Sequence, residues 1–118
     1  MRIVRLAGIR SDWIREFQSH GVRAAALTGG SGEAHFYVLR FEPGSAIGEH
    51  KTGFGQLLIV LEGSGWVEQA GHRRDIGQGF AAIFECGVMH AKGSDSGMLA
   101  LMVQVENLAM APDYEAGE

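Results

Sequence analysis

The sequence predicts an all-β protein, a single barrel or sandwich of short antiparallel strands. Short apolar segments recur along the chain, and turn residues interrupt them about every eight to twelve positions. Glycine is used 18 times and proline only twice in 118 residues, and glycine suits the tight turns that join such strands. No shift in composition marks a domain boundary, so residues 1–118 are expected to form one domain.

The N-terminal part predicts one edge strand and one helix. Residues 2–6 (RIVRL) alternate in polarity, as a short edge strand does. Residues 11–21 (SDWIREFQSHG) predict a helix, because Ser11 suits its N-terminal cap and Trp13 and Phe17 share one face. We therefore expect one short N-terminal helix ahead of the barrel.

The remaining residues predict a run of strands and turns. Residues 22–27 fit a strand or a helix, and the glycine-rich residues 28–33 (TGGSGE) predict a loop. A chain reversal is expected at residues 63–65 (GSG), and an acidic, frayed tail at residues 107–118. Strands are expected over residues 34–41, 45–52, 56–62, 66–70, 80–85, 88–93 and 98–106. The barrel core is thus expected over residues 34–106, preceded by the strand and helix of residues 1–33.

Charge and hydropathy limit the expected partners. Ten basic and fourteen acidic residues give a formal net charge of −4, which does not favour nucleic acid, because its binding modules usually carry a basic face. The single cysteine, Cys86, has no partner for a disulfide within the chain, as is usual in a reducing cytoplasm. No stretch approaches the roughly 18 apolar residues of a membrane span. We expect a cytoplasmic protein with neither nucleic-acid nor membrane partners.

Two spaced motifs contain histidines. In the first, Gly44 is followed by His50, Thr52, Gln56 and Gly63. The spacing resembles the first motif of the cupin family, which has a second histidine where this chain has Thr52 and a glutamate where it has Gln56. Residues two apart in a strand face the same way, so His50 and Thr52 are expected to share a face.

The second motif lies further along the chain. Gly79 is followed by Glu85, Gly87, His90 and Ser94. This order is similar to the second cupin motif, with Glu85 in place of a proline and Ser94 in place of an asparagine.

The resemblance covers residues 44–94, and it implies a single-domain cupin β-barrel, that is, a double-stranded β-helix or jelly roll. In cupins, three histidines and one glutamate hold a divalent metal in the barrel mouth. Carried over by position, the resemblance implies His50 and His90 as metal ligands and Gln56 as a weaker one. The candidate metals are Zn, Ni, Mn, Fe and Cu.

Two alternatives stay open for this set of ligands. His50, Gln56 and His90 bring no negative charge to offset a divalent ion, and removing an ion from water is costly. Either the pocket nevertheless holds such a metal, or His50 and His90 are hydrogen-bonded residues of a metal-free pocket. Glu85 is a candidate for the missing carboxylate.

Further residues are candidates for the lining of the pocket. His35 and Tyr37 share one face of the strand expected over residues 34–41, and the expected hairpin before Gln56 carries Phe54. The full set of lining candidates is Thr52, His35, Tyr37 and Phe54.

The sequence leaves the function open among several classes. We expect a pocket around His50 and His90 that binds a small organic ligand and is able to bind a divalent metal. One alternative is a metal-dependent cupin enzyme, such as a dioxygenase, isomerase, lyase or cyclase; another is a metal-free module that binds or senses a small molecule. The resemblance also implies a homodimer, since cupins commonly pair through sheet faces and edges, with residues 2–6 as a candidate exchange strand.

Overall fold

The computed structural model describes residues 1–110, and these confirm the all-β prediction. This part of the chain contains ten strands and one 3-10 helix, η1 (Leu6–Gly8). The strands are β1 (Arg2–Arg5), β2 (Asp12–Trp13), β3 (Arg23–Ala24), β4 (Thr28–Phe41), β5 (Ser45–Lys51), β6 (Gly55–Gln69), β7 (His72–Gly77), β8 (Phe80–Phe84), β9 (Met89–Ser94) and β10 (Met98–Met110). None of the helical structure in residues 1–110 has the length and apolar character needed to cross a membrane.

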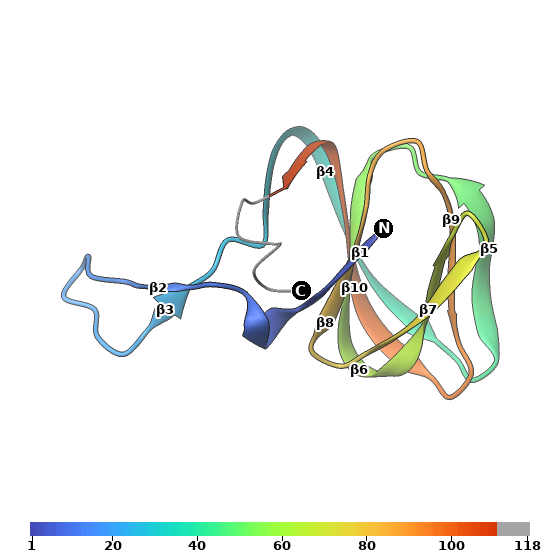
Figure 1. Cartoon of the computed structure of the whole chain (residues 1–118), viewed down its shortest axis with the longest axis horizontal. Helices are drawn as coiled ribbons and strands as arrows, with labels where there is room; N and C mark the ends of the chain where they lie inside the picture. The colour runs from blue at the N-terminus through green and yellow to red at the C-terminus, as the bar shows by residue number, and fades with distance from the viewer. Residues whose placement is uncertain (111–118) are drawn as a thin grey trace.

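Two antiparallel walls form a barrel and share one long strand (Figure 1). One wall has the strand order β1-β8-β6-β10-β4, and the other has the order β5-β9-β6-β7. β1 ends the first wall and pairs with β8, which confirms the edge strand predicted over residues 2–6. β6 belongs to both walls, because its first half pairs with β8 and β10 and its second half with β7 and β9.

The chain reversal predicted at residues 63–65 is wrong, because β6 continues through it. Gly63 has a φ of 77°, and a Cβ atom at this position would lie 2.3 Å from the Gly97 carbonyl oxygen. Glycine therefore lets β6 bend from one wall into the other while it passes close to the neighbouring chain.

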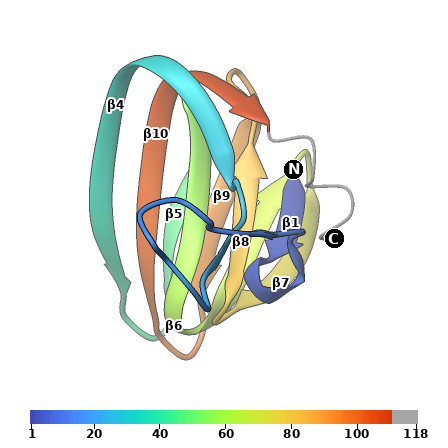
Figure 2. The same cartoon turned by 90° about the vertical axis from the view of Figure 1, so that its left-hand side faces the viewer.

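The pair formed by β4 and β10 corrects two further predictions (Figure 2). Residues 28–33, predicted as a loop, are the first part of β4 and pair with the end of β10 beyond a register shift after Val105. Their glycines allow a close approach between the strands: a Cβ atom at Gly30 would lie 2.7 Å from Val105 Cγ1. Residues 107–110, predicted as part of a frayed tail, are strand, while residues 111–118 of that tail lie outside the described residues.

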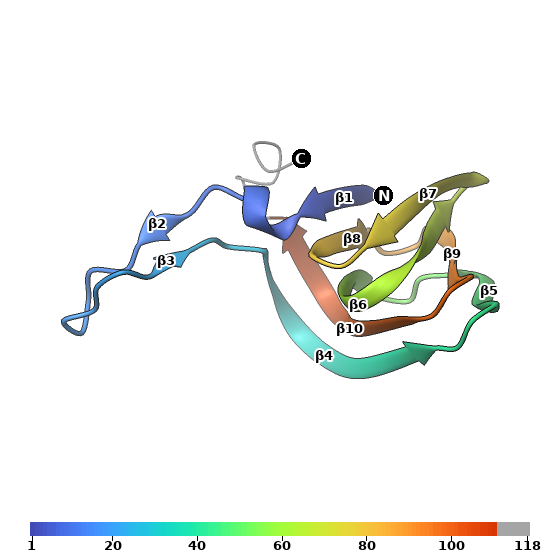
Figure 3. The same cartoon turned by 90° about the horizontal axis from the view of Figure 1, so that it is seen from below.

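The helix predicted over residues 11–21 is also wrong. These residues belong to a hairpin arm, residues 12–24, in which β2 pairs with β3 and Trp13 lies opposite Arg23. Phe17 and Gln18 near its tip have φ values of 59° and 57°, outside the helical range. The arm stands away from the barrel (Figures 1 and 3), and Phe17 is 94% exposed. Among residues 1–110, Phe17 therefore has no apolar surface to pack against, and a helix this short needs such packing.

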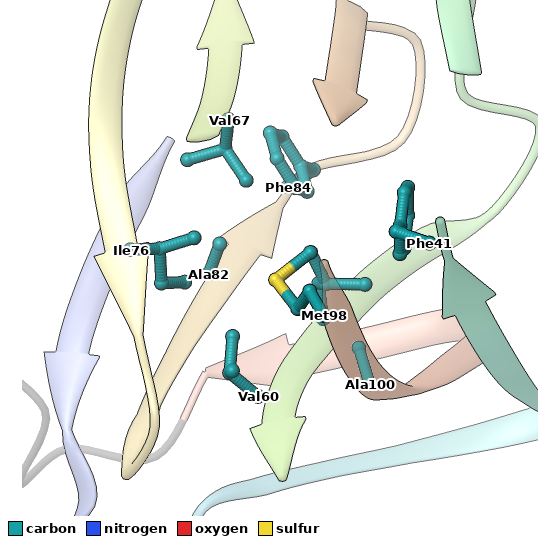
Figure 4. Packing of buried hydrophobic residues seen from close by; sticks show 9 residues of the cluster. Phe41, Val60, Val67, Ile76, Ala82, Phe84, Met98 and Ala100 are labelled. Carbon is teal, nitrogen blue, oxygen red and sulfur yellow. The ribbon is translucent and has the colours of Figure 1, made fainter. Parts of the chain in front are cut away.

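An apolar core fills the space between the two walls (Figure 4). It contains residues of both walls, which identifies their shared face as the barrel interior. Its buried members are Phe41, Leu58, Val60, Val67, Ile76, Ala82, Phe84, Met98 and Ala100. A second cluster of Val4, Ile9, Leu57 and Ile83 covers the outer side of the first wall. Leu57 and Leu58 thus point to opposite faces of the same strand.

Candidate ligand site inside the barrel

Strand register gathers a set of polar side chains on the inner face of the barrel. On β9, His90 and Lys92 are two positions apart and share a face. His50 of β5 lies directly opposite His90. On the other wall, Gln56 of β6 lies opposite Phe84 of β8, a member of the interior cluster. Residues from three strands and both walls therefore meet inside the barrel.

The structure brings the two predicted histidines into contact. The Nε2 atoms of His50 and His90 lie 3.2 Å apart, and the ring centroids are separated by 4.6 Å. His50 is exposed, whereas His90 is fully buried. The pair therefore leads from solvent into the barrel.

Hydrogen bonding orders the protons on the two rings. His50 Nδ1 lies 2.8 Å from the Gly48 carbonyl oxygen, to which only a protonated nitrogen can donate. In neutral His50 the Nε2 atom is then an acceptor, and His90 Nε2 donates to it. This leaves His90 Nδ1 as a buried acceptor, and no hydrogen-bond partner for it exists among residues 1–110.

His90 is electrically neutral at physiological pH. Burial, followed by the charges of Lys92 and His50, lowers the pKa of the His90 imidazole from 6.5 to about 3. The inner end of the histidine pair is therefore a hydrogen-bonding group rather than a cation.

Lys92 is the residue of this site that the sequence interpretation missed. Its side chain is 1% exposed, and Nζ donates a hydrogen bond of 2.5 Å to Gln56 Oε1 on the opposite wall. The ammonium also lies 4.0 Å from Met102 Sδ and 5.7 Å from the centre of the Phe84 ring. Burial lowers its pKa from 10.5 to about 8. Strand parity was the available signal, because a lysine two residues after an inward histidine must also point inward.

Thr52 lies in the turn between β5 and β6, directly after the end of β5. It is buried, its hydroxyl donates to the Glu85 carbonyl oxygen at 2.9 Å, and the Val88 amide donates to the hydroxyl at 3.2 Å. Both bonds fasten the turn between β5 and β6 to the turn between β8 and β9. Glu85 itself has an exposed side chain.

The remaining lining candidates form a cluster of their own. His35 stacks against Tyr37 and Phe54, with ring centroids 6.4 Å and 6.1 Å away. The His35 Nε2 atom also pairs with a Glu33 carboxylate oxygen. Tyr37 lies opposite Met102, the methionine in contact with the Lys92 ammonium. The aromatic cluster thus adjoins the polar interior through Met102.

The predicted metal-ligand set does not fit an ion with Lys92 in this position. Two imidazole nitrogens 3.2 Å apart have a spacing that one ion at about 2.0–2.1 Å from each would accept. The Gln56 oxygen, however, is occupied by an ammonium group, whose charge repels a divalent cation. Within residues 1–110, no cluster of three or more His, Cys, Asp or Glu side chains is placed to hold a metal.

The two-walled antiparallel barrel, with paired histidines on adjacent strands of its interior, defines a small cupin domain. The family model described as the AraC-like ligand binding domain matches residues 33–113. The chain therefore belongs to the family of AraC-like ligand-binding domains. No curated protein matches the chain.

Solved structures with the same fold include several cupins. A cupin superfamily protein from Desulfitobacterium hafniense matches with a TM-score of 0.61 and 14% identity, covering 67% of this chain and 72% of its own. A cupin-like protein from Thermotoga maritima matches with a TM-score of 0.60 and 21% identity, covering 71% and 72%. Salicylate 1,2-dioxygenase from Pseudoaminobacter salicylatoxidans matches with a TM-score of 0.58 and 14% identity, over 60% of this chain but only 20% of the enzyme. At these identities the likeness establishes the fold.

Proposed function

We propose that the protein binds a small organic molecule inside the barrel, at a site built around His50 and His90. The observation that carries this proposal is the contact between the two rings, one exposed and one buried, which leaves His90 Nδ1 as an unpartnered acceptor among the described residues. A buried polar atom without a partner is costly, and a ligand that donates to it removes the cost. Membership of a ligand-binding family supports the same proposal.

The test is a thermal-shift screen of small acids, sugars and aromatic compounds. A ligand at a hundred times its dissociation constant stabilises the folded state by about 2.7 kcal/mol. Compounds that raise the melting temperature are then measured against His50→Ala, with His20→Ala in the hairpin arm as the matched control. The proposal requires that His50→Ala weaken the binding and that His20→Ala leave it unchanged. Compounds whose affinity is changed by neither substitution bind elsewhere, and they would contradict the proposal.

A metal-dependent cupin enzyme of the dioxygenase, isomerase, lyase or cyclase type is the second candidate. The one observation in its favour is the 3.2 Å spacing of the two Nε2 atoms. Elemental analysis of protein grown with added Zn, Ni, Mn, Fe and Cu tests it. Stoichiometric metal that is lost in His90→Ala would support the enzyme, and less than a trace would remove it.

We also propose that two copies of the chain associate as a homodimer through the outer side of β4. Phe36 and Val38 are neighbours on that side, and each is 69% exposed. Exposed apolar patches of this kind commonly mark association surfaces. Light scattering should give twice the mass of one chain, and Phe36→Lys with Val38→Lys should give the monomer. A monomeric wild-type protein would contradict this proposal.

A further inference from the structure

Among residues 1–110, the barrel interior contains a cation, the Lys92 ammonium, for which no counter-charge is found. Lys92 is one of only two lysines in the chain, and its side chain is almost completely shielded from solvent. Within residues 1–110, its contacts are an amide oxygen, a thioether sulfur and an aromatic ring. The ion pairs found in this part of the chain join other residues, Glu33 with His35 and Glu68 with Arg73.

Such an arrangement is unfavourable for the protein alone. A buried charge is costly unless it is paired and fully hydrogen-bonded. An ammonium has three hydrogens to donate, and here one meets the Gln56 oxygen and another only a weak sulfur acceptor. The Gln56 oxygen accepts a hydrogen bond from the ammonium group, but it is neutral and supplies no negative charge. A carboxylate would supply both the missing charge and a strong acceptor.

We propose that Lys92 is a ligand-binding residue whose ammonium group contacts the carboxylate of a small organic acid inside the barrel. This inference rests on the proposed function, since it assumes that the ligand enters beside the exposed His50. The Lys92 side chain lies on the same face of β9 as His90, two positions further along the strand, so an acid that passes His50 and His90 would reach its ammonium group. Phe84 and Met102 beside the ammonium offer apolar contact to the body of the acid, which points to a monocarboxylate with an apolar or aromatic body.

The competing explanation makes Lys92 a structural link between the walls. Its bond to Gln56 joins β9 to the first half of β6, and a link of this kind would need the donor but not the charge. Lys92→Gln separates the two explanations, because it keeps a hydrogen-bond donor and removes the positive charge. Lys92→Met with Gln56→Leu is a second variant that leaves no polar group unpaired if the first folds poorly.

The binding experiment compares acids with their uncharged amides. Benzoate, phenylacetate and 4-methylpentanoate are titrated at up to 20 mM at constant ionic strength, beside the matching primary amides. We expect each acid that binds to do so at least tenfold more tightly than its amide. Lys92→Gln should lose at least tenfold in affinity for the acids and leave the affinity for the amides unchanged. His50→Ala should weaken binding of both sets, because it alters the entrance that they share.

A direct readout is available because the chain has two lysines, Lys51 and Lys92. Protein labelled with ¹³C-lysine gives two Cε resonances, which Lys51→Arg assigns. A bound acid should shift the Lys92 resonance and leave that of the exposed Lys51 in place.

Three results would overturn the inference: equal affinity for acids and amides, full acid affinity in Lys92→Gln, or no shift of the Lys92 resonance by any acid at 20 mM. Failure of the proposed function has a different signature. In that case the compounds bind, but His50→Ala does not change their affinity.

Discussion

Lys92 Nζ donates a hydrogen bond to Gln56 Oε1 across the barrel, and this bond joins two residues that lie 36 positions apart on opposite walls. Gln56 occupies the position where the cupin motif has a metal-binding glutamate. In cupins that glutamate supplies negative charge to the metal. In this chain, the residue at the same position accepts a hydrogen bond from the ammonium group of a lysine. The interior thus contains a positive charge, which belongs to the Lys92 side chain rather than to a bound ion.

Removing the buried cation should stabilise the protein. In Lys92→Met with Gln56→Leu, two buried polar side chains are replaced by apolar ones of similar size, so that neither leaves an unpaired partner. We expect the free energy of unfolding at pH 7 to rise by about 1–4 kcal/mol, as for other buried charges replaced in this way. Urea denaturation measures it, with Lys51→Met as the exposed control, which should change stability by less than about 0.5 kcal/mol. A loss of stability in the double variant would show that Lys92 is a net stabilising link.

Acid should destabilise the protein through His90. The pKa of His90 is about 3 in the folded protein and 6.5 as the ordinary value, so between these pH values the unfolded chain binds a proton that the folded chain does not. Stability should therefore fall as the pH drops from 6.5 toward 3, by up to about 1.4 kcal/mol per pH unit from this group. Urea midpoints at pH 6.5 and 4.5 test this. The loss should be smaller in His90→Leu, and equal losses in the two proteins would contradict it.

Raising the pH above 8 should stabilise the protein through Lys92. Its pKa is about 8 when folded and 10.5 ordinarily, so between pH 8 and 10.5 the unfolded chain retains a proton that the folded chain has lost. The contribution of this group to stability should rise with pH across that window. Urea midpoints at pH 8 and 10 should show the gain in the wild type and in Lys51→Met but not in Lys92→Met. A gain that survives in Lys92→Met would have another origin.

A metal site should require two changes rather than one. Gln56→Glu alone places a carboxylate next to the Lys92 ammonium, and the two should form an ion pair. Gln56→Glu with Lys92→Met frees that carboxylate for an ion beside His50 and His90. Competition with a chelator should therefore detect at least tenfold tighter zinc binding in the double variant than in Gln56→Glu. Equal affinity would mean that Lys92 does not oppose the metal.

Thr52 should contribute to stability through its two turn contacts. Thr52→Val preserves the shape of the side chain but removes the acceptor for the Val88 amide and the donor to the Glu85 carbonyl. We expect a loss of about 1–3 kcal/mol, the usual effect of leaving buried polar groups unpaired. Thermal unfolding measures it, and Thr28→Val at the half-buried start of β4 is the control. An unchanged melting temperature would indicate that water replaces both bonds.

Much of the barrel was predictable because its signals are local. The alternation of residues 34–41 and the glycine-bounded segments that follow set the strands. The contact between His50 and His90 could also be predicted, because the two motifs place each histidine on a strand and on the side of that strand that faces the barrel interior. The predictions for residues 28–33 and 63–65 were wrong for one shared reason. Glycine was interpreted as a sign of a turn or loop, whereas here it lets strands bend or pass close to one another.

The parts that could not be predicted depend on distant contacts. Whether residues 11–21 form a helix depends on an apolar surface that Trp13 and Phe17 could cover. The local sequence does not reveal that the described part of the barrel offers no such surface to Phe17. The partner of Gln56 depends on the reach of Lys92 from the other wall. A lysine in a strand is usually solvated, so only its parity with His90 distinguished it.

The passage of β6 through both walls has a consequence for how the molecule comes apart. Each wall is hydrogen-bonded to β6, so neither wall can open without breaking bonds of a strand that also belongs to the other wall. Local opening that spares half of the barrel is therefore disfavoured, and amide protons of β8, β9 and β10 should exchange with deuterium at one common rate, set by global unfolding. The proposed ligand site takes residues from both walls, so it should form in full or not at all.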